Sequence, residues 1–135
     1  MRTFVVTGGA GFIGSHIVSH LVERGDRVRV IDNLCAGYRS NLDHVKSDIE
    51  FIEEDICDAK VLESAFQGVD VVFHKAALAS VPYSIEHPME VNQACVTGTL
   101  NVLNEAQKAG VRRVVYAGSS TVSYTHLTLP TTPYV

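Results

Sequence analysis

A glycine-rich stretch near the N-terminus, Thr7–Gly14 with the sequence TGGAGFIG, constrains this chain more than any other feature. The apolar run Phe4–Val6 precedes it, and a helical pattern with apolar residues on one face follows over residues 17–22. A strand, a glycine turn and a helix in this order form the context of a dinucleotide-binding loop. The stretch therefore predicts a loop that binds a pyrophosphate at the N-terminus of the first helix.

The residues of this loop have separate expected tasks. Gly8 is expected to take the positive φ of a tight turn, and Gly11 is expected to let the backbone come close to a pyrophosphate. Gly14 would allow the first helix to pack closely on the strand. The N–H groups of Phe12 and Ile13, at the positive end of that helix, would favour a doubly charged anion. The glycine pattern alone is a weak signal, because glycine-rich turns also serve ordinary loops.

A second strand pattern over residues 27–31 ends in Asp32. The separation of Gly14 and Asp32 is close to the spacing of about 20 residues that is typical of a ribose-binding carboxylate. The alternative is a solvated acid at a strand end, and the glycine loop favours the ribose role. An acid at this position also repels a 2′-phosphate, which favours NAD over NADP, and the nearby Arg39 keeps this preference moderate.

Composition and charge exclude several other classes of protein. The chain has 135 residues, which suits one domain with a core, and its net charge of −4 predicts no binding to nucleic acid or to an anionic membrane. No apolar segment approaches the length of a membrane span, and the N-terminus enters a strand without a signal-peptide pattern. Cys35, Cys57 and Cys95 form no C-x-x-C pair, which predicts reduced thiols in a cytoplasmic protein. We expect no metal site, and we interpret His16 and His74 as a helix-surface and a core histidine.

Strand and helix patterns alternate along the chain. Helices are expected after Gly14, after the N-cap Asp58, and from Pro88 to Gly110, where Gly98 indicates close packing. A loop with one helical turn is expected over residues 33–46, and a loop or a broken helix is expected over 74–87. The expected strands span residues 4–6, 27–31, 49–52, 69–73 and 111–117. Right-handed crossovers then predict an α/β, doubly wound parallel sheet in the order 3-2-1-4-5.

These segments resemble the extended short-chain dehydrogenase/reductase family, and specifically its NAD-dependent nucleotide-sugar epimerases and dehydratases of the UDP-glucose 4-epimerase type. The matching segments occur in order at residues 7–16, 32–34, 55–56, 74–77, 96–103 and 113–120. The resemblance implies a Rossmann domain truncated after the fifth strand, an NAD cofactor, and a nucleotide-sugar substrate, a UDP-sugar, for the full-length parent. It also implies a parent homodimer, because many relatives dimerise through the region of the helix that begins at Pro88.

The resemblance further implies which residues form the site. The pyrophosphate is assigned to Gly8, Gly11, Phe12, Ile13 and Gly14, and the ribose to Asp32 with Asn33 beside it. The adenine is flanked by Asp55 and Ile56, and the cofactor channel is lined by Ala76 and Ala77. Ser119 matches the active-site serine or threonine that follows the fifth strand, and Ser80 and Tyr83 lie where contacts to the sugar nucleotide often fall.

Two departures from the family pattern affect the chemistry. Cys95 stands where the family often has Asn, and no tyrosine of the chain is followed four residues later by the lysine of the family's Tyr-x-x-x-Lys pair. In a complete relative this tyrosine is the general base, and the lysine lowers its pKa from a usual value near 10. We therefore expect this chain to be inactive, with Ser119 as a positioned hydroxyl. The alternative is an NAD-sensing or scaffold module on the same fold.

The C-terminal residues have a different composition. From Ser119 to Val135 the chain contains no Asp, Glu, Lys or Arg, and residues 122–132 resemble one reading frame of a transposase adapter used for sequencing libraries. We therefore expect an incomplete NAD-binding domain in residues 1–121 and a non-native or disordered tail in residues 122–135.

An independent, longer assembly of the same locus tests the interpretation of the tail. We expect its translation to follow this chain to about Thr121 and then to continue toward a Tyr-x-x-x-Lys pair. An assembly that encodes residues 122–132 unchanged would refute the adapter hypothesis.

Overall fold

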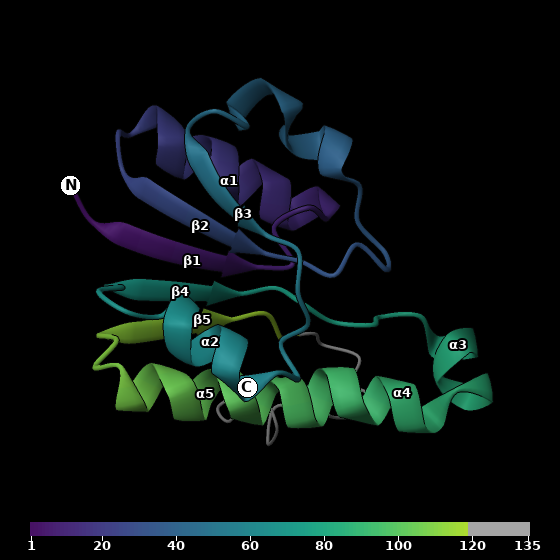
Figure 1. Cartoon of the computed structure of the whole chain (residues 1–135). Coiled ribbons are helices and arrows are strands. Elements are labelled where there is room, and N and C mark those ends of the chain that lie inside the picture. The colour runs from purple at the N-terminus through teal and green to yellow at the C-terminus, as the bar shows by residue number, and fades with distance from the viewer. Residues whose placement is uncertain (119–135) are drawn as a thin grey trace, which may run out of the picture.

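Five short strands form one parallel sheet in the computed structural model, which describes residues 1–118 (Figure 1). The strands are β1 (Thr3–Thr7), β2 (Arg27–Ile31), β3 (Ile49–Ile52), β4 (Val71–His74) and β5 (Arg113–Tyr116). They lie in the order β3-β2-β1-β4-β5, and each neighbouring pair is parallel. The predicted fold class and strand order are confirmed.

Helices connect these strands by crossovers on both faces of the sheet. The connections are α1 (Phe12–Glu23), the 3₁₀ helix η1 (Arg39–Val45), α2 (Ala59–Ala65), α3 (Val81–Glu86), α4 (Pro88–Asn92), the π-helical turn η2 (Gln93–Thr97) and α5 (Gly98–Lys108). In Figure 1, α1 lies with β1, β2 and β3, whereas α2 and α5 lie together beside β4 and β5. None of these helices combines the length and the apolar character that a membrane span requires.

The sheet separates two hydrophobic cores, because successive residues of a strand point to opposite faces. Phe4 and Val6 of β1 pack in one core with Val18 of α1. Val5 packs in the other core with Leu62 of α2 and Val102 of α5. The central strand β1 is thus buried on both faces, as expected for a parallel sheet covered by helices on each side.

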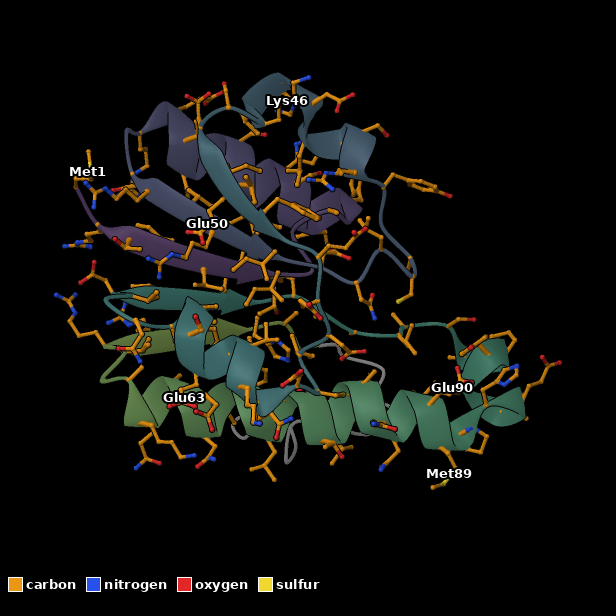
Figure 2. The ribbon with its side chains drawn as sticks, in the orientation of Figure 1. Met1, Lys46, Glu50, Glu63, Met89 and Glu90 are labelled. Atoms are coloured by element: carbon orange, nitrogen blue, oxygen red, sulfur yellow. The ribbon has the colours of Figure 1, made fainter. Side chains whose placement is uncertain are left out.

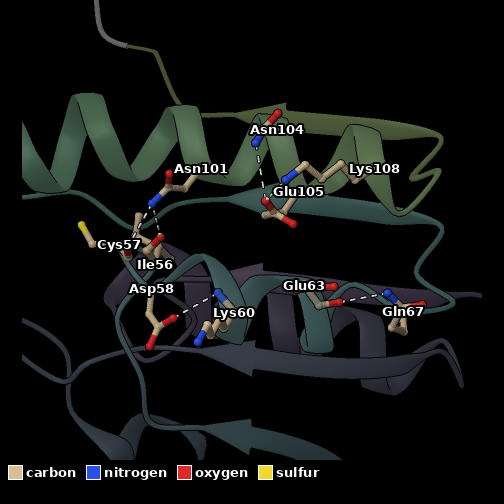
Figure 3. Close-up of polar contacts among 10 residues, drawn as sticks. All are labelled: Ile56, Cys57, Asp58, Lys60, Glu63, Gln67, Asn101, Asn104, Glu105 and Lys108. Carbon is tan, nitrogen blue, oxygen red and sulfur yellow. Dashed lines mark hydrogen bonds and ion pairs between the residues drawn. The ribbon is translucent and has the colours of Figure 1, made fainter.

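Several elements differ from the sequence prediction at their ends. The fourth strand was expected over 69–73 and spans Val71–His74, because the register with β1 pairs His74 with Thr7. The segment expected to be a loop with one turn contains η1, a seven-residue helix with Leu42 and Val45 buried. Asp58 caps α2 as predicted, since its side chain accepts a hydrogen bond from Lys60 N (Figure 3).

The long helix expected from Pro88 contains the π-helical turn η2 just before Gly98. The widened turn directs the N–H of Gly98 to the carbonyl of Gln93, which also accepts a hydrogen bond from Cys57 Sγ at 3.4 Å. A Cβ atom on Gly98 would lie 2.6 Å from Cδ1 of Ile56. Close packing at Gly98 is therefore confirmed, and its neighbour is the segment that follows β3.

One face of the same helical region carries exposed apolar side chains. Met89, Val96, Leu100 and Leu103 are 79%, 60%, 64% and 45% exposed. Val96, Leu100 and Leu103 are spaced by four and three residues, which places them on one face of the helix. Met89 points away from the sheet in Figure 2. The helix thus buries Val102 and Ala106 against the sheet and leaves a second apolar stripe on the surface.

The contact at Gly98 gives a test of the packing. We expect Gly98→Ala to lower the free energy of unfolding by about 1–3 kcal/mol, because the new methyl group collides with Ile56. Urea unfolding followed by circular dichroism measures this change. The double variant Gly98→Ala/Ile56→Val should recover part of the loss, because Val lacks the Cδ1 atom. A stabilised Gly98→Ala variant, as helix propensity alone predicts, would contradict the contact.

Candidate functional site

A cleft of about 680 Å³ opens at the carboxyl ends of the strands. Its lining residues follow the strands on both sides of the point where the strand order reverses, between β1 and β4. Ligands bind at this position in open α/β sheets, and Figure 1 shows the two strands side by side. The glycine loop, the end of β2, the segment after β3 and the segment after β4 supply its walls. Among the predicted site residues, those that line it are Gly8, Gly11, Asp32, Asn33, Asp55, Ile56, Ala76 and Ala77.

The glycine loop is held by backbone contacts that leave no room for side chains. Gly8 has a φ of 68°, as predicted, and a Cβ atom there would lie 2.7 Å from the N atom of Ala76. A Cβ atom on Gly14 would collide with the carbonyl O of Gly8 and would lie 2.8 Å from the Cα of Gly9. Gly14 was expected to pack on the strand. Its neighbour is the turn itself, because α1 begins directly above Gly8 and Gly9.

The N-terminus of α1 presents unused hydrogen-bond donors. Ser15 N bonds to Gly11 O, and no acceptor among residues 1–118 is bonded to the N–H groups of Phe12, Ile13 or Gly14. The first turn contains no acidic side chain, so the positive end of the helix is not neutralised locally. Donors of this kind, beside glycines without side chains, fit a pyrophosphate.

The side chains of Phe12 and Ile13 do not line this cleft. They are 79% and 61% exposed and border a separate groove of about 490 Å³ that runs along α1 to Phe73 of β4. The role expected for both residues concerns their backbone N–H groups and does not involve these side chains. Side chains of the first helical turn point outward from the helix axis, whereas its N–H groups point back along that axis.

Asp32 is buried and joins two loops, so it is not a solvated acid at a strand end. Its exposed fraction is 9%. Oδ2 accepts a hydrogen bond from Ala10 N at 2.9 Å, and Oδ1 accepts one from Leu34 N at 2.8 Å. The second bond closes a turn in which Leu34 takes a φ of 59°, an unusual value for a residue other than glycine. Each carboxylate oxygen keeps further acceptor capacity toward the cleft.

The far wall of the cleft is a polar turn after β3. Asp55 accepts hydrogen bonds from Cys57 N at 2.8 Å and from Asn33 Nδ2 at 3.3 Å, and the backbone bond from Cys57 lowers the pKa of Asp55. Ile56 is buried beneath this turn. Asn101 of α5 donates to the carbonyl groups of Ile56 and Cys57 at 3.3 and 3.1 Å (Figure 3). Asn101 was not among the predicted site residues, because no single-sequence pattern shows which loop a helix amide will reach.

Cys57 borders the same wall of the cleft. Burial and the neighbouring Asp55 raise the pKa of its thiol to about 11. The thiol is therefore protonated at neutral pH and acts as a weak donor to the carbonyl of Gln93. Among the described residues all three cysteines are free thiols, as predicted.

Lys75 brings positive charge to the cleft. It is the single basic residue among the described residues that line the cleft, and it directly follows β4 beside Ala76 and Ala77. The sequence suggested only a surface or loop cation here. Its position next to the glycine loop is decided by the pairing of β4 with β1, which the sequence shows only indirectly.

The outer end of the cleft is formed by α3 and α4. Ser80 and Tyr83 both line it, and Ser80 Oγ accepts a hydrogen bond from Tyr83 N, which caps α3. The Tyr83 hydroxyl donates to Glu90, and this bond raises the pKa of Tyr83.

Cys95 faces the carbonyl of Leu78 at 3.7 Å and does not border the cleft. Ser119 and the tail at residues 122–135 lie outside the described residues.

Comparison with known protein families shows to which family this chain belongs. A family model described as the NAD dependent epimerase/dehydratase family matches residues 4–132. This chain belongs to that family. The predicted resemblance is therefore confirmed, and the family's members include enzymes that act on nucleotide sugars.

Individual relatives agree in sequence and in structure. UDP-glucose 4-epimerase from Erwinia amylovora is 40% identical over 126 residues, which are 89% of this chain and 37% of the relative. The solved UDP-N-acetylglucosamine 4-epimerase from Methanobrevibacter ruminantium, in complex with UDP-N-acetylmuramic acid, superimposes with a TM-score of 0.88 at 38% identity over 96% of this chain and 41% of that one. The solved UDP-glucose 4-epimerase from Thermus thermophilus, in complex with NAD, superimposes with a TM-score of 0.80 and is 40% identical. The match covers 87% of this chain and 38% of that chain. The chain thus spans about two fifths of the length of these relatives.

The two hydrogen bonds at Asp32 predict a stability effect that needs no ligand. We expect Asp32→Asn to lower the free energy of unfolding by about 1–3 kcal/mol, because an amide can accept only one of the two backbone N–H groups and turns its own NH₂ toward the other. Urea unfolding measures the loss. Asp43→Asn at an exposed position of η1 is the matched control, with an expected change within about 0.5 kcal/mol. Equal effects of the two substitutions would contradict the buried role.

Proposed function

We propose that this chain is the NAD-binding part of a nucleotide-sugar epimerase or dehydratase. The observation that carries the proposal is the joint presence, in one cleft at the switch point of the sheet, of the open N-terminus of α1 and the buried carboxylate of Asp32. The free N–H groups suit the pyrophosphate, and the remaining acceptor capacity of Asp32 suits the ribose hydroxyls.

The residues that line the cleft would hold the two halves of the dinucleotide at different places. Asn33, Asp55 and Ile56 would hold the adenosine half, and Ala76 and Ala77 would border the nicotinamide half. Apart from Lys75, the residues of the segment 75–77 are alanines. Their small side chains leave room for a flat ring to lie against the backbone. When bound, NAD supplies the acceptor and donor of a hydride at a sugar carbon.

The site favours NAD over NADP. Asp32 carries a buried negative charge where a 2′-phosphate would lie, and burying two like charges together is costly. Arg39, which the sequence left as a possible partner for a phosphate, has its guanidinium 4.5 Å from the centre of the Phe51 ring and does not border the cleft. Its stacking on Phe51 supports a structural role.

The reaction of the parent protein needs residues beyond the described part. We propose a UDP-sugar as its substrate, because the relatives with solved structures include enzymes with bound UDP-sugars. Ser119 is proposed to hydrogen-bond the reacting sugar oxygen, next to the tyrosine base of the family. Since these 135 residues contain no Tyr-x-x-x-Lys pair, we propose that they bind the cofactor without turnover. The related proteins are enzymes, which favours this interpretation over an NAD-sensing or scaffold module.

The exposed stripe on α4 to α5 supports a homodimeric parent. Val96, Leu100 and Leu103 project from one face that no described residue covers. A second copy packed against this face by a two-fold axis would bury the stripe of both protomers.

We propose that the parent protein is located in the cytoplasm. The free thiols are consistent with this location.

Cofactor binding by the 135-residue chain tests the proposal. We expect isothermal titration calorimetry to detect NAD binding and to give an affinity for NADP that is weaker by about tenfold or more, because of the charge on Asp32. A coupled assay with UDP-glucose should detect no epimerisation. An absence of NAD binding, or equal affinities for NAD and NADP, would contradict the assignment of Asp32 to the ribose.

A substitution in the glycine loop tests the pyrophosphate contact separately. Gly11 has φ −77° and ψ 176°, which any residue can adopt, and a Cβ atom there would lie 3.3 Å from Gly8 O. We therefore expect Gly11→Ala to fold and to weaken NAD binding by about tenfold, as its methyl group obstructs the diphosphate. Gly118→Ala, where a Cβ atom would meet open space, is the matched control and should bind as the unmodified chain does.

A further inference from the structure

Two buried side chains and a partly buried one form a hydrogen-bonded row beneath the cleft. Thr7 Oγ1 of β1 lies 2.7 Å from His74 Nδ1 of β4, and His74 Nε2 lies 2.8 Å from Thr99 Oγ1 of α5. Thr7 is fully buried, and His74 is 5% exposed. None of the three borders the cleft, and the function proposed above assigns no task to them.

The partners of Thr7 determine where the proton of His74 resides. Thr7 Oγ1 accepts a hydrogen bond from Ala76 N at 3.2 Å and a shared one from Lys75 N at 3.1 Å. A hydroxyl group has two acceptor positions and one hydrogen, so this hydrogen is left for His74 Nδ1. Nδ1 is therefore an acceptor without a proton, and Nε2 carries the hydrogen that is donated to Thr99 Oγ1. Only the neutral Nε2–H tautomer satisfies every group in the row.

The row also holds the segment that lines the cleft. Ala76 N donates a hydrogen bond to Thr7 Oγ1. The same N atom lies so close to Gly8 that a Cβ atom on Gly8 would be only 2.7 Å from it. The backbone at Ala76 is thus held between the hydroxyl of Thr7 and the turn at Gly8. A second proton on His74 would turn Nδ1 into a donor toward an oxygen whose acceptor positions are already filled. One of the bonds to residues 75–76 would then be lost.

The charged and titratable surroundings of His74 are sparse. Lys75 follows it in the chain, and Tyr116 is its register partner on β5. The partners of the ring on β1 and α5, Thr7 and Thr99, do not titrate, and Cys95, one helical turn before Thr99, directs its sulfur toward Leu78 O. No carboxylate among the described residues accepts a hydrogen bond from the ring, so no such partner stabilises a second proton on it.

We propose that His74 is a positioning residue that holds residues 75–77 against Gly8 in its neutral form alone, so that dinucleotide binding weakens when His74 takes up a proton. The inference rests on the proposed function for its ligand, and its structural part concerns residues of this chain only. The row would then make cofactor affinity depend on pH through a group that does not touch the cofactor.

The direction of the pH effect follows from the environment of the ring. Burial, and to a smaller extent the charge of Lys75, lowers the pKa of His74 below its usual value of 6.5. The folded chain therefore stays neutral at His74 at neutral pH and takes up the proton only at lower pH. The unfolded chain takes it up near the usual value, so the stability contributed by the neutral ring falls as pH drops below about 6.5 and levels off below the pKa of the folded state.

The ring nitrogens give a readout that needs neither a variant nor a ligand. We expect nitrogen-15 NMR of the whole chain at about pH 7.5 to show the Nε2–H tautomer of His74. On titration to lower pH, the protonation of His74 should coincide with shifts of the amide resonances of Lys75, Ala76 and Ala77. An Nδ1–H tautomer, or a titration that leaves these amides unchanged, would overturn the inference.

Cofactor affinity gives the second readout. By calorimetry at about pH 7.5 and at about one pH unit below the midpoint of the His74 titration seen by NMR, we expect the unmodified chain to lose about tenfold in NAD affinity at the lower pH. His74→Asn keeps a carbonyl oxygen as acceptor for Thr7 without a titrating group, so its affinity should change little between the two pH values. The control His20→Gln, at an exposed position of α1, should keep the full pH dependence.

The outcomes separate this inference from the proposed function. No NAD binding at either pH would contradict the proposed function, and the NMR titration would still decide whether His74 positions residues 75–77. Binding with the same affinity at both pH values, or a His74→Asn variant that retains the pH dependence, would overturn the inference while leaving the cofactor assignment intact.

Discussion

The structure depends on the close approach of three backbone segments at the carboxyl end of β1. The turn at Gly8 and Gly9, the first turn of α1 at Gly14, and the segment at Ala76 meet within distances that exclude a Cβ atom at either Gly8 or Gly14. This contact brings the open N–H groups of α1 to the point where the order of the strands reverses. The cleft exists because backbone, rather than side chains, forms its floor.

Asp32 connects this floor to the neighbouring wall. Its carboxylate holds Ala10 in the glycine loop and Leu34 in the loop after β2, and its burial makes both hydrogen bonds stronger than they would be in water. The same group is the proposed ribose acceptor. A single carboxylate thus serves fold and ligand, which means that a loss of binding in an Asp32 variant must always be compared with its loss of stability.

Much of the architecture could be predicted from local patterns. The strand at residues 27–31, the strand at 49–52, the Asp58 cap and the strand order follow from apolar periodicity, capping and the handedness of crossovers. The π-helical turn η2 and the reach of Asn101 to the Ile56 carbonyl could not. Each of these depends on contacts between segments that are distant in the sequence.

The sequence by itself determined the family, the class of cofactor and several of the residues around the cleft, because the glycine spacing and the acid that follows the second strand are local signals tied to one chemistry. Tertiary structure alone decided the roles of Thr7, His74 and Thr99. They come from β1, β4 and α5, and a hydrogen-bonded row among them forms only when the pairing of β1 with β4 and the packing of α5 bring polar groups together in the buried interior. In such a place each donor must find an acceptor, and this requirement fixes the protonation state of the histidine.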